Sequence, residues 1–170
     1  MMLKPQDVMV MLKLISIKEQ DWTYNQLAME LFMSPSEVHA AVQRALQVHL
    51  ATTVQGVIRA HKSALAEFLV HGIKYVFIPE RGEITRGMPT IYTVPPMDTL
   101  TSSIDELPPV WPDAEGEIRG ESFSPLYKSA PRAARKDKQL YELLVLVDAI
   151  RGGRAREKAL AVDEIKQRFA

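Results

Sequence analysis

Two short helices joined by a tight corner are predicted between residues 23 and 47. In the second helix, apolar side chains recur at i, i+3, i+4, i+7 and i+8, which places them on one buried face. They are Val38, Ala41, Val42, Ala45 and Leu46. In the first helix, a similar face is formed by Leu27, Ala28 and Leu31. Only Phe32 and Met33 remain between the two helices.

Capping residues support both helix starts. Thr23 with Gln26, and Ser34 with Glu37, have the separation of a capping box, and Pro35 stands at a first helical position. The outward side of the second helix, over residues 35–47, is polar or small. It carries Ser36, His39, Ala40, Gln43, Arg44 and Gln47. This layout is typical of a helix-turn-helix, whose second helix enters the DNA major groove. The alternative is an ordinary helical hairpin with a solvated outer face.

The positions that define this pattern are Tyr24, Leu27, Ala28, Leu31, Met33, Ser34, Val38, Val42 and Leu46. With these residues the stretch resembles the helix-turn-helix of bacterial winged-helix transcription factors, broadly MarR-like ones. The resemblance implies a double-stranded DNA partner. The residues expected at base edges are Ser36, His39, Gln43 and Arg44, with Gln43 suited to adenine and Arg44 to guanine. The residues expected at phosphates near helix N-termini are Tyr24, Asn25 and Ser34.

A β-ribbon is predicted directly after the second helix. Residues 50–54 and 57–59 have strand-forming composition, and Gln55-Gly56 can turn between them. In a winged helix such a ribbon touches the DNA backbone or the minor groove. The residues placed to contact phosphate are Thr52, Thr53, Gln55 and Arg59.

A second hairpin is a rival for the wing. Strands predicted over residues 74–78 and 91–94 flank a segment in which Arg81 and Arg86 each lie near a glycine. Arginines presented in this way can insert into a groove of DNA. The other interpretation is a structural hairpin with two solvated arginines, and the sequence leaves both open.

Further helices are predicted around these elements. A helix starting at Pro5 would complete a three-helix core, and another covers residues 61–71. The helix over residues 137–150 is apolar on more than one side, so it must be buried against the main domain or against a second subunit. Gly152-Gly153 separates it from a final amphipathic helix.

Charge and proline content divide the chain into three parts. The formal net charge is zero, but residues 94–127 hold one basic and seven acidic side chains, whereas residues 128–170 hold eleven basic and six acidic ones. We therefore expect a winged helix-turn-helix domain over 1–94, an acidic proline-rich connector over 95–130 and a C-terminal helical pair over 131–170. Trp111 is expected to anchor the connector, and the helical pair is expected to form a dimer. The basic tail could pair with the acidic connector, face phosphate or simply be solvated.

No catalytic pattern was found in the sequence. The chain has no cysteine and lacks the GxxxxGK, HExxH and GxSxG motifs, and its four histidines are not spaced as metal ligands. We therefore expect no enzymatic activity, no cofactor and no metal. No apolar run is long enough to span a membrane, and Lys4 and Asp7 interrupt the start too early for a signal peptide, so a cytoplasmic location is expected.

The sequence thus predicts an α+β, mainly α protein, a winged helix-turn-helix with a C-terminal helical extension. Its expected function is sequence-specific binding of double-stranded DNA as a homodimeric transcriptional regulator. One alternative is an antitoxin or adaptor-type interaction module whose partner is another protein, encoded nearby. Another is a winged helix used only for assembly.

Overall fold

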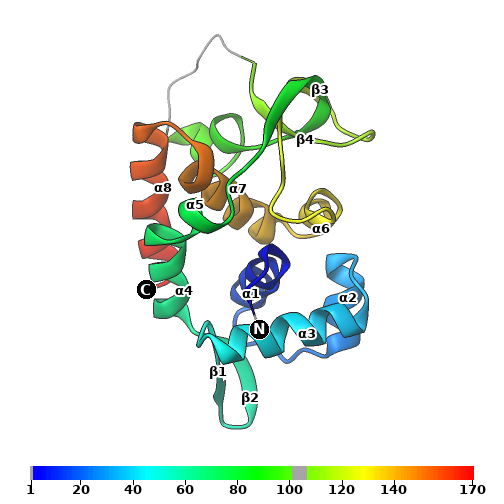
Figure 1. Ribbon diagram of the computed structural model, residues 1–170, viewed down its shortest axis with the longest axis vertical. Coiled ribbons are helices and arrows are strands. Elements are labelled where there is room, and N and C mark those ends of the chain that lie inside the picture. Colours follow the sequence, from blue (N-terminus) through cyan, green and yellow to red (C-terminus); the bar gives the residue numbers. More distant parts are fainter. Residues whose placement is uncertain (1, 101–106) are drawn as a thin grey trace.

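Helix α1 (Pro5–Ile17) runs through the middle of the computed structural model, which describes residues 2–100 and 107–170 (Figure 1). Eight consecutive residues of α1, from Asp7 to Leu14, are buried. The sequence predicted that this helix would complete a three-helix core with the helix pair, but α3 packs on one side of it and α7 on the other. The described part is α+β and mainly helical, as predicted.

The predicted pair of helices is present as α2 (Tyr24–Leu31) and α3 (Pro35–Gln47). Thr23 caps α2 by accepting a hydrogen bond from the Gln26 amide at 3.1 Å. At α3 the capping box is reciprocal: the Ser34 hydroxyl accepts from the Glu37 amide, and the Glu37 carboxylate accepts from the Ser34 amide, both at 3.1 Å. The capping residues in the sequence therefore located both helix starts.

The predicted ribbon after α3 is present as β1 (Ala51–Val54) and β2 (Val57–Ala60), an antiparallel pair. Gln55 and Gly56 form its two-residue turn with φ angles of 52° and 80°. Positive φ at both central residues is the geometry that matches the twist of a hairpin. The ribbon projects from the body beside α3 (Figure 1).

The predicted rival hairpin does not exist. Helix α4 (Lys62–His71) is followed by a short helix, α5 (Ile73–Val76), where the sequence predicted a strand, and the second predicted strand is a 3-10 turn, Ile91–Thr93. Strand propensity is a weak preference that tertiary packing overrides. Here Ile73 is fully buried, and α5 packs against α7.

The residues between those two segments form a strand of a different sheet. Strand β3 (Arg81–Pro89) pairs antiparallel with β4 (Pro109–Pro112) and with β5 (Ile118–Phe123), and β4 and β5 pair with each other in parallel. The three strands therefore close on themselves. Gly87 permits this closure, because a Cβ atom at that position would lie 2.1 Å from the backbone oxygen of Trp111.

The predicted connector is therefore partly regular structure, and its residues 101–106 lie outside the described residues. Trp111 anchors it as predicted, since the indole is fully buried. The indole N–H donates to Asp148 of helix α7 (Lys138–Gly152) at 2.7 Å. This contact joins the small sheet to the helical body.

Helix α7 is covered by its own chain. Its residues from Leu143 to Arg151 are all buried, and α1, α4, α5, helix α6 (Ala130–Lys136) and helix α8 (Ala155–Arg168) pack around it. Burial of α7 therefore needs no second subunit, although the homodimer itself stays a prediction. In the described residues, none of the helices has the length and apolar character needed to cross a membrane.

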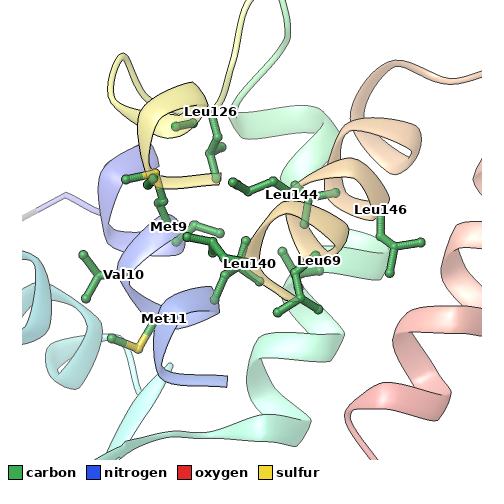
Figure 2. Close-up of a cluster of buried hydrophobic side chains, with 14 of the residues drawn as sticks. Met9, Val10, Met11, Leu69, Leu126, Leu140, Leu144 and Leu146 are labelled. Carbon is green, nitrogen blue, oxygen red and sulfur yellow. The ribbon is translucent and has the colours of Figure 1, made fainter. Parts of the chain in front are cut away.

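One hydrophobic cluster unites all three predicted parts of the chain (Figure 2). Met9 of α1 points toward Leu140 of α7 and toward Leu126, which precedes α6, while Val10 and Met11 lie on the side of α1 that faces α3. A polar contact reinforces the joint between α1 and α7. Lys13 Nζ donates to a carboxylate oxygen of Asp137, the N-cap residue of α7, at 2.8 Å.

Candidate nucleic-acid interface

The outward face of α3 is open to solvent, as the DNA hypothesis requires. Ser36, His39 and Gln43 are exposed, whereas the apolar stripe of the helix is buried in the core except for the half-buried Leu46. The Ser36 hydroxyl lies 3.1 Å from that of the half-buried Ser34, so both group at the N-terminus of α3. These are hydrogen-bonding side chains of the kind that read base edges or contact phosphate.

An aromatic row holds α3, α2 and the ribbon in one arrangement. The ring of His39 lies 5.1 Å from that of Tyr24, and the ring of Tyr24 lies 5.2 Å from that of Trp22, both centroid to centroid. Trp22 in turn donates from its indole N–H to the Ile58 carbonyl of β2 at 3.1 Å. Tyr24 is therefore half-buried and packs between His39 and Trp22, while Asn25 beside it is exposed.

Arg44 does not lie with the exposed residues of α3, and its assignment to guanine is corrected here. Its guanidinium donates to both oxygens of Asp7 on α1, at 2.8 Å from Nε and 2.7 Å from Nη2. Asp7 is fully buried and the Arg44 side chain is 11 % exposed. The hydrogen bond to Asp7 also raises the pKa of Arg44. An arginine held in this way presents no free donor fork to a base.

Helical spacing explains the different direction of Arg44. It follows Glu37 by seven residues, or two turns, so the two side chains share one flank of α3. That flank faces the body of the protein: Glu37 accepts a hydrogen bond from Tyr127, just as Arg44 donates to Asp7. His39 lies on the other flank and reaches Tyr24.

Of the ribbon residues predicted to contact phosphate, some are exposed and one bonds to the body of the protein. Thr53 and Gln55 are exposed near its tip, and Thr52 is half-buried nearer its base. Arg59 donates to the carbonyls of Gln20 at 3.0 Å and Glu19 at 3.1 Å, just beyond the C-terminal end of α1. The phosphate role predicted for Arg59 is therefore replaced by a supporting one, because these bonds engage its guanidinium.

The two arginines of the rival wing lie elsewhere. They belong to β3, at the opposite end of the molecule from the β1–β2 ribbon (Figure 1). Arg81 donates to the Gly152 carbonyl and pairs with Glu121, and Arg86 donates to the Gly116 carbonyl. Both support the closed sheet, and the structure does not bring them together with α3.

A row of cations borders the corner between α2 and α3, and the sequence did not place it there. We call this row the basic strip, and define it as Lys128, Arg132 and Lys136, which are all exposed. Its residues are four apart, so Arg132 and Lys136 share one side of α6. The Arg132 guanidinium lies 4.2 Å from the ring centroid of Phe32 in the corner, and the Lys136 ammonium lies 5.3 Å from it. The sequence indicated only that residues 128–170 are basic, with a basic run over 131–136, and not where these cations lie.

The segment that leads into α6 is fastened to the start of α3. The hydroxyl of Tyr127 donates to Glu37 Oε2 at 2.7 Å. This hydrogen bond, with those from Ser34, holds the pKa of Glu37 below its usual value. Burial, and then the bond to Glu37, raise the pKa of Tyr127 to about 12. The contact thus connects the basic strip to the N-terminus of α3.

We expect Tyr127→Phe to lower the free energy of unfolding by about 1 kcal/mol at neutral pH, the usual net value of a hydrogen bond. Since the pKa of Glu37 is lowered in the folded state, its stabilising contribution exists above the ordinary value of 4.5 and is lost as the pH falls through the folded value. The pKa of Tyr127 is raised, so its stabilising contribution exists below the ordinary value of 10.0 and is lost as the pH rises through about 12.

Urea unfolding of the unmodified protein and of Tyr127→Phe across the pH range measures the difference between their free energies of unfolding. It should be largest near neutrality and shrink in acid and in strong base. Tyr75→Phe is the matched control, because Tyr75 is 74 % exposed. A difference that does not change with pH would contradict the assignment of the bond to the ionised Glu37.

Comparisons with protein-family models, with curated proteins and with solved structures found no match for this chain.

Proposed function

We propose that this protein is a winged helix-turn-helix protein that binds double-stranded DNA in a sequence-specific way and acts as a transcriptional regulator. The observation that carries the proposal is the exposed polar face of α3, a helix that has the projecting ribbon at its C-terminal end and the basic strip beside the corner at its N-terminal end. A helix needs such an open face, with donors and acceptors on it, to enter a major groove. Ser36, His39 and Gln43 are the residues we assign to base edges.

The basic strip supplies the exposed positive charge that α2 and α3 lack. Affinity for DNA comes largely from cations that neutralise phosphates and release counterions. Neither Arg44 nor Arg59 is available for this, because both are bound within the protein. Lys128, Arg132 and Lys136 are exposed beside the corner, and we assign them to the phosphate backbone, together with Asn25, Thr53 and Gln55.

Selection of duplexes from a random pool, followed by titration of the selected duplex, tests the proposal. We expect Gln43→Ala to cost about 1–3 kcal/mol of specific binding and to relax one base preference, because a bidentate contact to one base is lost. Lys136→Ala should weaken all duplexes to a similar degree and lower the salt slope by about one ion. Lys166→Ala, an exposed lysine on α8, is the control and should change neither.

The proposal fails if no duplex is selected, or if the duplexes that bind do so with no dependence on salt. Regulators of this kind bind two-fold sites as dimers. We therefore include a homodimer in the proposal, to be measured by light scattering at the concentrations used for DNA binding. A strictly monomeric protein that selects a single half-site would remove the dimer and keep the rest.

A protein-interaction module is the second candidate, and an exposed apolar patch favours it. Tyr75, Val76 and Ile78, on and just after α5, are 74 %, 55 % and 71 % exposed. Exposed apolar side chains that gather in one place are typical of protein interfaces. Co-expression with the product of an adjacent gene tests this candidate: a stable complex that Tyr75→Asp disrupts, with no duplex selected from the pool, would replace the first proposal.

A further inference from the structure

A cavity lies between the ribbon and the C-terminal helices, and none of the residues that we assign to DNA lines it. Its volume is about 730 Å³, and the C-terminal end of α1, both strands of the ribbon, α7 and α8 line it. We call it the ribbon groove. Sites for small molecules have volumes of about 300–1,000 Å³, so the groove has the size of a metabolite site.

The groove has an apolar lining and a charged border. Leu14, Ile15 and Leu143 contribute side chains to its surface, and Leu14 and Leu143 belong to the hydrophobic core. Among the lining residues are four cationic side chains and only two carboxylates, Glu19 and Glu142. An apolar lining with an excess of positive charge matches a ligand that has an apolar body and an anionic group.

Two of the cations are free to bind such a group. Lys18 and Lys62 are exposed, and no ion pair within residues 2–100 and 107–170 involves either ammonium. The other two are already engaged: Arg59 by the carbonyls of Glu19 and Gln20, and Arg168 by Glu142 at 2.9 Å. Lys18 and Lys62 therefore supply positive charge that is not held in an ion pair, from two elements, the end of α1 and the start of α4.

We propose that the ribbon groove binds a small amphipathic anion, an aromatic or branched apolar body that carries one carboxylate or sulfonate. The body lies against Leu14, Ile15 and Leu143, and the anionic group lies near Lys18 and Lys62. Both strands of the ribbon contribute lining residues, among them Thr52 and Ala60. A bound molecule therefore contacts the ribbon and α7 together, and it restricts the motion of the ribbon relative to the helical body.

The test uses 1-naphthoate as the anionic probe and 1-naphthalenemethanol as the neutral analogue of similar size, each titrated calorimetrically into the full chain without DNA. We expect saturable binding of one naphthoate per chain and at least tenfold weaker binding of the alcohol. Lys18→Glu combined with Lys62→Glu should weaken naphthoate about tenfold or more. Lys166→Glu, which changes the same charge on α8 outside the groove, should have no effect.

Amide hydrogen exchange locates the site without relying on the variants. Naphthoate should slow exchange in the ribbon, over residues 51–60, and leave β3 unchanged. The proposal is overturned if naphthoate does not saturate, if the alcohol binds equally well, or if the charge-reversed protein binds as the unmodified one does. Because DNA is absent from these measurements, failure of duplex binding would leave their outcome standing.

Discussion

Replacing Asp148 with alanine is expected to lower the free energy of unfolding by about 3–5 kcal/mol, the cost of breaking a buried ion pair from one side. The carboxylate is 1 % exposed. One of its oxygens accepts from Arg151 at 2.9 Å, and the other accepts from the Thr90 hydroxyl and the Trp111 indole, each at 2.7 Å. Removing it leaves a buried guanidinium and two buried donors without their shared acceptor.

The other hydrogen bonds of Arg151 keep its guanidinium from turning toward solvent once Asp148 is removed. It also donates to the carbonyls of Phe77 and Ser124, each at 3.0 Å, so its guanidinium holds together α5, the end of the small sheet and α7. Turning toward solvent would cost those bonds as well. The Asp148 variant should therefore lose the attachment of the small sheet along with its stability.

Urea unfolding measures the effect, with two comparisons. Asp148→Asn keeps the shape and one acceptor, so we expect a smaller loss than for alanine. Asp163→Ala, an exposed carboxylate on α8, should change stability by less than about 0.5 kcal/mol. If Asp148→Ala were as stable as the Asp163 control, the network would not be holding the sheet to α7.

The helices were predictable because their signals are local. The spacing of Val38, Ala41, Val42 and Ala45 is set by the geometry of one helix, and Ser34 caps the same helix that it precedes. The two-residue turn of the ribbon is likewise encoded by Gln55 and Gly56. In each case the residues that decide the structure lie within a few positions of one another.

The small sheet was not predictable because its pairing is non-local. The residues that β3 pairs with lie more than twenty positions further along the chain, and its sequence contains Gly82, Gly87 and Pro89, which reduce any local strand signal. Conversely, Tyr75 and Val76 have strand propensity but lie in a short helix, because burial of Ile73 against α7 decides the conformation.

The sequence predicted the exposed polar face of the candidate site, but not the positions of the positive charges around it. The exposed face of α3 follows from the helical pattern, and His39 and Gln43 lie where that pattern places them. Position in sequence could not show that α6 lies beside the corner, because the contact between Arg132 and Phe32 joins residues one hundred positions apart. It also could not show that Arg44 has a buried partner in α1.

Arg44→Ala is therefore expected to act on stability more than on base preference. It leaves Asp7 as a buried carboxylate without its cation, and such a change costs about 3–5 kcal/mol. Asp7→Ala should cost a similar amount, since it leaves the guanidinium unpaired and also removes the acceptor of the Lys4 amide. The double variant should lose less than the sum of the two single losses, with a coupling energy of about 0.5–3 kcal/mol.

Urea unfolding of the unmodified protein, the two single variants and the double variant gives the coupling energy. Duplex selection with the folded fraction of Arg44→Ala then tests whether Arg44 contacts a base or only joins α3 to α1. If the side chain only joins α3 to α1, the selected sequences stay the same while the concentration of folded protein falls. Gln43→Ala, one residue earlier on the exposed face, is the matched control for a true base contact. A fully stable Arg44→Ala protein that selects different sequences would show that Arg44 leaves Asp7 when DNA binds, and would return it to the base-reading set.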